Sequence, residues 1–227
     1  MEEGYIASYD FINEPIYHCK IPLPENSRFN DCTVDRIGRI FTGNVPKNNR
    51  SGNLFKIDIT LDTTIISKEI FFPNGMAFDE EMNFLYVSDT FNKEIHKFDY
   101  NISTGTVTNK KLFVQINESD SAPDGLTIDS ENHIWAAING ASKVIRFNPN
   151  GDLEREILLP AKNVTSLCFG GADLKTVFIS TESEKSKYPF RKNSGSILSL
   201  QSEIKGRNEN YSKINLNKIF KLNLING

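Results

Sequence analysis

Short segments in which apolar and polar residues alternate recur along the chain, and polar turns separate them. Residues 94–98 and 143–147 are clear examples. Alternation with a period of two predicts β-strands, because successive side chains of a strand point to opposite faces of the sheet. No helix-period stretch of comparable length competes with this pattern. The chain is therefore predicted to be all-β, and an up-and-down sandwich is the alternative to a repeat architecture.

Two segments share the same order of features: PNGMAFDEEMNFLYVSDTFNKEIHKFDYN from residue 73 and PDGLTIDSENHIWAAINGASKVIRFNPNG from residue 123. Each begins with Pro, then Asn or Asp, then Gly, and continues through three short strands separated by turns. The same order fits RFNDCTVDRIGRIFTG upstream and, more loosely, VTSLCFGGADLKTVFIST downstream. Such self-similarity indicates a repeat protein rather than a single irregular sheet.

The equivalent residues of the four repeats are Asn30, Asn74, Asp124 and Thr165, which are separated by 44, 50 and 41 residues. Repeats of about 40–50 residues that each hold several strands are typical of β-propeller blades. Because equivalent positions lie at one height around a propeller channel, we expect these four side chains to form part of a ring of oxygen donors. Such donors suit Ca²⁺, Mg²⁺ or Mn²⁺. Taken singly, Asn74-Gly75 and Asp124-Gly125 are also common turn dipeptides.

The same pattern predicts the domain organisation. Residues 4–21 are expected to form a hairpin that finishes an earlier blade, and residues 195–202 a final strand. A propeller domain over residues 1–205 would then be followed by a polar C-terminal extension, 206–227. Its repeats are expected near residues 27–72, 73–122, 123–163 and 164–202.

The segments SRFNDCTVDRIGRIFTGNV, PNGMAFDEEMNFLYVSDT, APDGLTIDSENHIWAAING and VTSLCFGG resemble the senescence marker protein/gluconolactonase/luciferin-regenerating (regucalcin) family. The resemblance implies a six-bladed β-propeller with one divalent cation in its channel, and hydrolysis of sugar lactones. Six blades of about 45 residues need roughly 270 residues. We therefore expect the N-terminal blade, or more, to be missing from this chain.

The resemblance also implies roles for particular residues. Asn74 and Asp124 match two ligands of the cation (Ca²⁺, Zn²⁺, Mn²⁺ or Mg²⁺), and Asp124 matches the general base. Arg28 and Asn30 match residues that hold the substrate. The family's third ligand, a first-blade Glu, has no counterpart here, and Lys47 lies where members often carry an acidic residue.

The expected function is hydrolysis of a small cyclic ester, with a lactone as the small-molecule partner. Phosphotriester hydrolysis is an alternative within catalysis. A non-catalytic calcium-binding or protein-interaction propeller is the alternative from another class. It would keep Asn74 and Asp124 but would not need Arg28 and Asn30 together.

Composition removes several other classes. The formal charge is −3 and no long basic run occurs, which argues against a nucleic-acid partner. No apolar stretch reaches membrane-spanning length and no export signal is evident, so we expect a cytoplasmic protein without a membrane partner. His96 is expected at an exposed strand position, and no paired His or Cys spacing predicts a zinc site of that kind. The sequence does not indicate an oligomeric state.

Overall fold

A computed structural model of the chain describes residues 4–47, 51–79, 81, 83–183 and 193–215. All regular secondary structure in these residues is β, and the described part of the chain contains no helix. The chain divides into two compact units, Met1–Pro73 with Asn210–Gly227, and Asn74–Glu209. The all-β prediction is confirmed.

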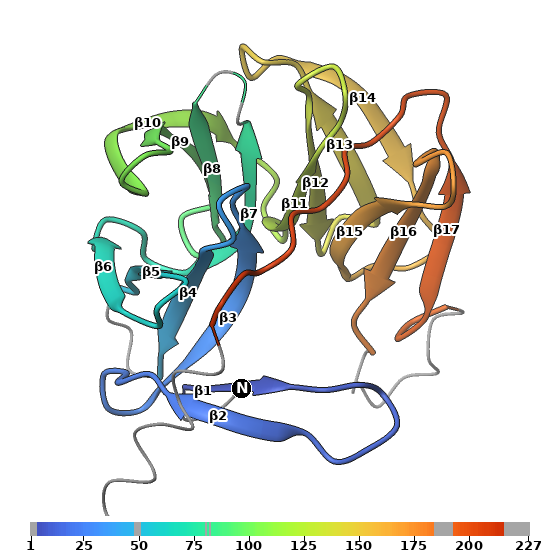
Figure 1. The fold of residues 1–227 in the computed structure, drawn as a ribbon. Helices are drawn as coiled ribbons and strands as arrows, with labels where there is room; N and C mark the ends of the chain where they lie inside the picture. The colour runs from blue at the N-terminus through green and yellow to red at the C-terminus, as the bar shows by residue number, and fades with distance from the viewer. Residues whose placement is uncertain (1–3, 48–50, 80, 82, 184–192, 216–227) are drawn as a thin grey trace, which may run out of the picture. The chain divides into compact units, whose positions relative to one another are not determined.

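The first unit contains a two-stranded hairpin and a four-stranded sheet (Figure 1). The hairpin pairs β1 (Tyr5–Ser8) with β2 (Ile16–Lys20), as expected for residues 4–21. The sheet is an antiparallel meander in chain order, from β3 (Ser27–Val34) and β4 (Ile40–Pro46) to β5 (Leu54–Ile57) and β6 (Thr63–Ser67).

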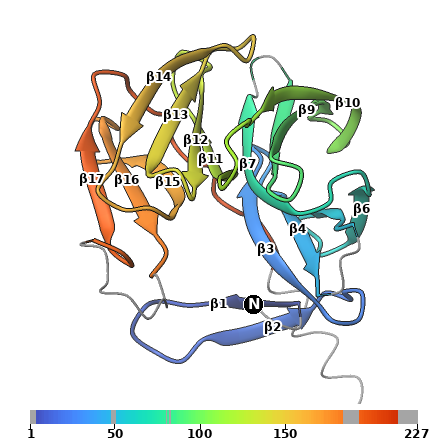
Figure 2. The same cartoon turned by 180° about the vertical axis from the view of Figure 1, so that it is seen from behind.

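The second unit contains three further meanders, and the views in Figures 1 and 2 both place the middle one between the other two. The strands of the first sheet are β7 (Pro73–Asp79), β8 (Phe84–Asp89), β9 (Glu94–Asn101) and β10 (Thr106–Gln115). Those of the middle sheet are β11 (Ala122–Ile128), β12 (Ile134–Asn139), β13 (Lys143–Phe147) and β14 (Leu153–Leu158). The last sheet consists of β15 (Val164–Gly170), β16 (Thr176–Thr181) and β17 (Ile197–Gln201).

The middle sheet is covered on both faces, which explains why β12 reads as an almost continuous apolar run. Ile134, Ala136 and Ile138 belong to the hydrophobic core shared with the β7–β10 sheet. Trp135 and Ala137 point the other way, into the core shared with the β15–β17 sheet. Antiparallel sheets stacked face to face in chain order are the packing of propeller blades.

A buried carboxylate recurs five residues after the donor position in three of the four repeats. Asp35, Asp79 and Asp129 are at most 1% exposed. Asp35 pairs with Arg39 at 2.6 Å, and Arg207 lies 3.8 Å from Asp79. Each carboxylate has a guanidinium beside it, as expected because a buried charge is retained only when it is paired and hydrogen-bonded.

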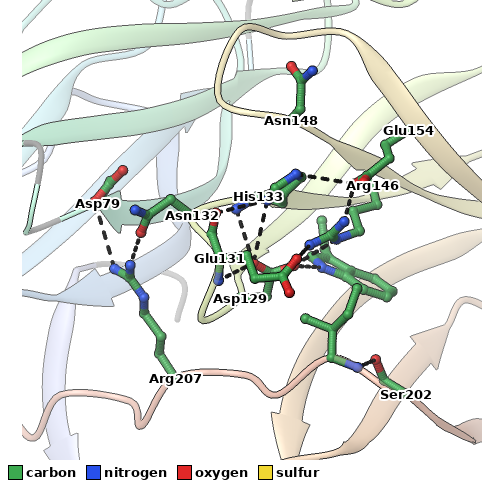
Figure 3. A network of polar contacts seen from close by, with 12 residues as sticks. Asp79, Asp129, Glu131, Asn132, His133, Arg146, Asn148, Glu154, Ser202 and Arg207 are labelled. Carbon is green, nitrogen blue, oxygen red and sulfur yellow. Dashed lines mark hydrogen bonds and ion pairs between the residues drawn. The ribbon is translucent and has the colours of Figure 1, made fainter.

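The pairing is most extensive around Asp129 (Figure 3). Its Oδ2 accepts hydrogen bonds from Arg146 Nε at 2.7 Å and from Trp135 Nε1 at 2.8 Å. Its Oδ1 accepts from the backbone N–H groups of Glu131 and His133. Arg146 also contacts the carboxylates of Glu131 and Glu154, so this network joins three strands of the middle sheet.

The segment that follows β17 contacts both units in turn. Within the second unit, Gly206 bridges to Asp129, and Arg207 lies 3.5 Å from Glu81. Within the first unit, Lys213 N donates to Gly38 O and Asn215 N donates to Ile59 O. Gly206, Lys213 and Asn215, in the segment expected to be a polar extension, therefore have backbone partners, and residues 216–227 lie outside the described residues.

The expectation that His96 is exposed is wrong. The residue is 4% exposed, because β9 lies between β8 and β10 and both of its faces are covered there. Burial lowers the pKa of His96, and the nearby Lys110 lowers it further.

No helix among the described residues is long and apolar enough to cross a membrane.

Candidate metal and substrate site

All four residues of the predicted ring lie on the first strand of their sheets. Asn30 is on β3, Asn74 on β7, Asp124 on β11 and Thr165 on β15, and all four are half-buried. They lie within these strands rather than just before them. The shared phase predicted from the repeats is therefore present in the structure.

The turn interpretation of Asn74-Gly75 and Asp124-Gly125 is wrong, because both dipeptides lie inside strands and neither glycine has a positive φ. These glycines permit close approach instead. A Cβ on Gly75 would lie 2.4 Å from the carbonyl oxygen of Asp124, and one on Gly125 would lie 2.4 Å from Ser166 Oγ. Each glycine thus lets the first strand of the next sheet pack directly against its own, which brings Asn74 and Asp124 together.

Replacing Gly75 with Ala should test this close approach. The new Cβ would also lie 2.3 Å from Leu126 N, so backbone has to move. We expect a loss of stability of about 1–3 kcal/mol, the usual cost of overpacking, measured by urea unfolding. Gly170→Ala is the matched control, because there the Cβ meets the ring of the exposed Phe178, which can rotate away. Equal stability of the two variants would contradict the interpretation.

A threonine connects the two candidate ligand segments. Asn74 Nδ2 donates to Thr90 Oγ1 at 3.1 Å, and Thr90 Oγ1 donates to the carbonyl of Pro123 at 2.8 Å. Pro123 immediately precedes Asp124, whose Oδ2 accepts a longer hydrogen bond, 3.4 Å, from Asn139 Nδ2. Thr90 and Asn139 follow or end the second strands of their sheets, β8 and β12.

The fourth ring position has a similar arrangement. Thr165 Oγ1 lies 2.9 Å from Ser180 Oγ, again a contact between a first strand and a second strand. Thr165 carries no charge, so this position contributes a neutral oxygen. The second unit therefore presents an amide, a carboxylate and a hydroxyl on three successive first strands.

Arg28 and Asn30 form a pair in the first unit. Arg28 Nη1 donates to Asn30 Oδ1 at 2.7 Å and to the carbonyl of Phe29 at 3.0 Å. Asn30 Nδ2 donates to the carbonyl of Pro73 at 3.0 Å. Both ends of the Asn30 amide are thus engaged, whereas the described contacts leave Arg28 Nε and Nη2 without a hydrogen-bond partner. Arg28 is therefore better placed than Asn30 to donate to a substrate.

The two residues that follow this pair have perturbed acidities. Burial raises the pKa of Asp31, although a hydrogen bond from Cys32 N at 2.7 Å opposes the rise. Cys32 is exposed, but partial loss of solvation raises the pKa of its thiol, and the neighbouring Asp31 raises it further. A thiol with a raised pKa is a poor nucleophile near neutral pH, which argues against cysteine chemistry here.

The structure thus brings Asn74 and Asp124 together in one unit and Arg28 and Asn30 together in the other. Sequence reasoning missed Thr90 and Asn139. The sequence did contain a hint of both residues. Each lies at or just after the end of the apolar second strand of its repeat, Thr90 in VSDT and Asn139 in AAING. The sequence could not predict their partners, because Thr90 lies 16 positions from Asn74 and Asn139 lies 15 positions from Asp124.

Meanders of antiparallel strands stacked in chain order, with equivalent donor residues on each first strand, define a β-propeller protein. Residues 8–183 match the SMP-30/Gluconolactonase/LRE-like region. The chain belongs to that family. A sugar lactone lactonase YvrE of Bacillus subtilis, itself named as putative, is 32% identical over 91% of this chain and 73% of its own length. The pentonolactonase XacC of Haloferax volcanii is 33% identical over 68% of this chain and 53% of its own length.

Solved structures agree on the fold. A luciferin-regenerating enzyme superposes with a TM-score of 0.82 at 22% identity, over 93% of this chain and 76% of that one. A calcium-binding regucalcin of Agrobacterium tumefaciens gives 0.81 at 22% identity, over 92% of this chain and 73% of that one. The described residues contain four sheets of three or four strands besides the hairpin. A six-bladed architecture stays a prediction.

Proposed function

We propose that this chain is part of a metal-dependent hydrolase that opens small sugar lactones. Asn74 and Asp124 hold the divalent cation, Asp124 also acts as general base, and Arg28 and Asn30 bind the substrate. Relatives named as a pentonolactonase and as a 6-deoxy-6-sulfogluconolactonase of Pseudomonas putida support sugar lactones as the substrate class.

The contact between the Asn74 and Asp124 segments is the observation on which the proposal rests. Gly75 lets β7 and β11 approach so closely that no other side chain fits there, and Thr90 hydrogen-bonds to both segments. This close approach places the amide-bearing and carboxylate-bearing segments next to each other, which supports a shared ligand role for Asn74 and Asp124.

The donor set fits a hard divalent cation. No group of three His, Cys, Asp or Glu side chains able to hold a metal occurs in the described ranges, so a cation held here would need amide oxygens besides the Asp124 carboxylate. Amide and carboxylate oxygens are ligands that Ca²⁺, Mg²⁺ and Mn²⁺ accept. A cation bound there would polarise the lactone carbonyl and lower the pKa of a bound water.

The protein groups would divide the remaining chemistry. Asp124 takes a proton from the attacking water as its oxygen bonds to the carbonyl carbon. Arg28 would bind the substrate through its unused N–H groups, which can stabilise negative charge on a substrate oxygen. Asn30 orients the Arg28 guanidinium through their 2.7 Å hydrogen bond. Cleavage of the ring C–O bond then gives a hydroxy acid, and the proton goes to the departing alkoxide.

Acid release from a panel of aldonolactones should test the proposal. We expect turnover by the purified protein with Ca²⁺, Mn²⁺ or Zn²⁺, loss of turnover after chelation, and recovery when the cation is returned. A phosphotriester substrate belongs in the same panel. Cation binding without turnover of any substrate would favour the non-catalytic calcium-binding alternative. Turnover that survives complete chelation would rule out the metal mechanism.

A further inference from the structure

Thr90 occupies a specific place between the two candidate ligands of the proposed metal centre. It directly follows β8, is half-buried, and its Oγ1 takes part in both contacts described above. Asn74 Nδ2 lies 3.1 Å from this oxygen, and the Pro123 carbonyl oxygen lies 2.8 Å from it.

The chemistry of these partners determines the direction of each hydrogen bond. A carbonyl oxygen can only accept, so Thr90 has to use its single hydroxyl proton on Pro123. Its oxygen is then an acceptor towards Asn74. The Asn74 amide must therefore present its NH₂ group to Thr90, and its Oδ1 is left as the end available to another partner. An amide rotated by 180° would place two acceptor oxygens against each other.

We propose that Thr90 is a positioning residue that orients the Asn74 amide so that Oδ1, and not Nδ2, faces the cation. This inference rests on the proposed function. One hydroxyl serves both ligand segments, because its other hydrogen bond holds the Pro123 carbonyl, one residue before Asp124. The 3.4 Å contact of Asn139 with Asp124 is longer, and it touches a carboxylate that offers oxygen at both ends.

Binding of Ca²⁺ and of Mn²⁺ alone, measured by calorimetry on the full chain, tests this role without relying on activity. We expect Thr90→Val to weaken cation binding by about 10- to 100-fold, the usual effect of losing a group that orients a ligand. Thr90→Ser keeps the hydroxyl and should bind within about threefold of the unchanged protein. Thr127→Val is the matched control, because Thr127 is a buried threonine on β11 whose side chain has no hydrogen bond within the described part of the chain.

A second background separates amide orientation from a general structural effect. In Asn74→Asp the ligand carries two equivalent oxygens, so its rotation no longer matters. The penalty of Thr90→Val should therefore shrink to less than about threefold in that background, as coupling between two contacting residues requires. A penalty that stays at tenfold or more would overturn the proposal, as would equal losses for Thr90→Ser and Thr90→Val.

Failure of this inference and failure of the proposed function give different results. If the unchanged protein binds neither cation, the metal centre itself is wrong, and the role of Thr90 is lost with it. If the unchanged protein binds a cation and Thr90→Val binds it equally well, the positioning role alone is wrong. A lower melting temperature of cation-free Thr90→Val with unaltered affinity would show that Thr90 is merely structural, which also overturns the proposal.

Discussion

Asp124→Asn should lower lactone turnover by about 100- to 10,000-fold, the range associated with loss of a general acid or base. The substitution preserves the shape of the side chain but replaces a carboxylate with an amide, which cannot take a proton from water near neutral pH. It also removes one negative charge from the proposed cation site. We therefore expect weaker cation binding as well, and the kinetic comparison should be made at saturating cation.

The control for this prediction is Asp120→Asn. Asp120 lies four residues earlier in the chain, on the link between β10 and β11, and is exposed. The variant undergoes the same chemical change at an exposed side chain that has no hydrogen bond to a site residue within the described part of the chain, so its turnover should equal that of the unchanged protein. Unaltered turnover in Asp124→Asn at saturating cation would remove Asp124 from the role of base.

Arg146→Met should produce the largest loss of stability, about 3–5 kcal/mol, because it breaks a buried ion pair from one side only. Arg146 is 2% exposed and Asp129 is fully buried. Without the guanidinium, Asp129 keeps its hydrogen bonds from Trp135 Nε1 and from two backbone N–H groups, but no other Lys or Arg among the described residues pairs with it. Since whole domains are stable by about 5–15 kcal/mol, this is a large fraction of the total.

Urea unfolding at neutral pH would measure this loss, with Arg155→Met as control. Arg155 is the cross-strand partner of Arg146 on β14, but its side chain is exposed, so its removal should cost little. Adding Asp129→Asn to Arg146→Met should recover part of the stability, because the uncompensated charge is then gone. A loss below about 1 kcal/mol for Arg146→Met would show that the pair contributes little net stability.

Much of the architecture could be read from local pattern. The hairpin at residues 4–21, three strands in each of the two clearest repeats and the last strand all occur as predicted. The fourth strands, β10 and β14, were not anticipated. Both lie at the outer edge of their sheets and are largely exposed, with Leu112, Leu153 and Leu158 facing solvent. Without burial on one face, selection for alternating apolar residues is weak and the strand signal fades.

The sequence by itself determined the phase of the repeats and the equivalent positions Asn30, Asn74, Asp124 and Thr165, each of which lies on the first strand of its sheet. This was possible because each repeat is built from short strands, whose pattern depends on residues close together in the chain. The sequence alone did not reveal the role of Gly75 and Gly125 in close packing. Gly75 and Gly125 resemble turn residues locally, and only the packing of neighbouring sheets shows why a side chain is excluded there.

Only the tertiary structure determined which side chains form ion pairs and hydrogen bonds with one another. Arg146 reaches Asp129 from two strands away, and Arg207 reaches Asp79 across most of the second unit's sequence. Thr90 fixes the direction of the Asn74 amide because the Pro123 carbonyl, on the next sheet, takes its single proton. Hydrogen bonds require two groups within about 3 Å and correctly oriented. That condition is set by how distant strands pack, and no local sequence pattern encodes it.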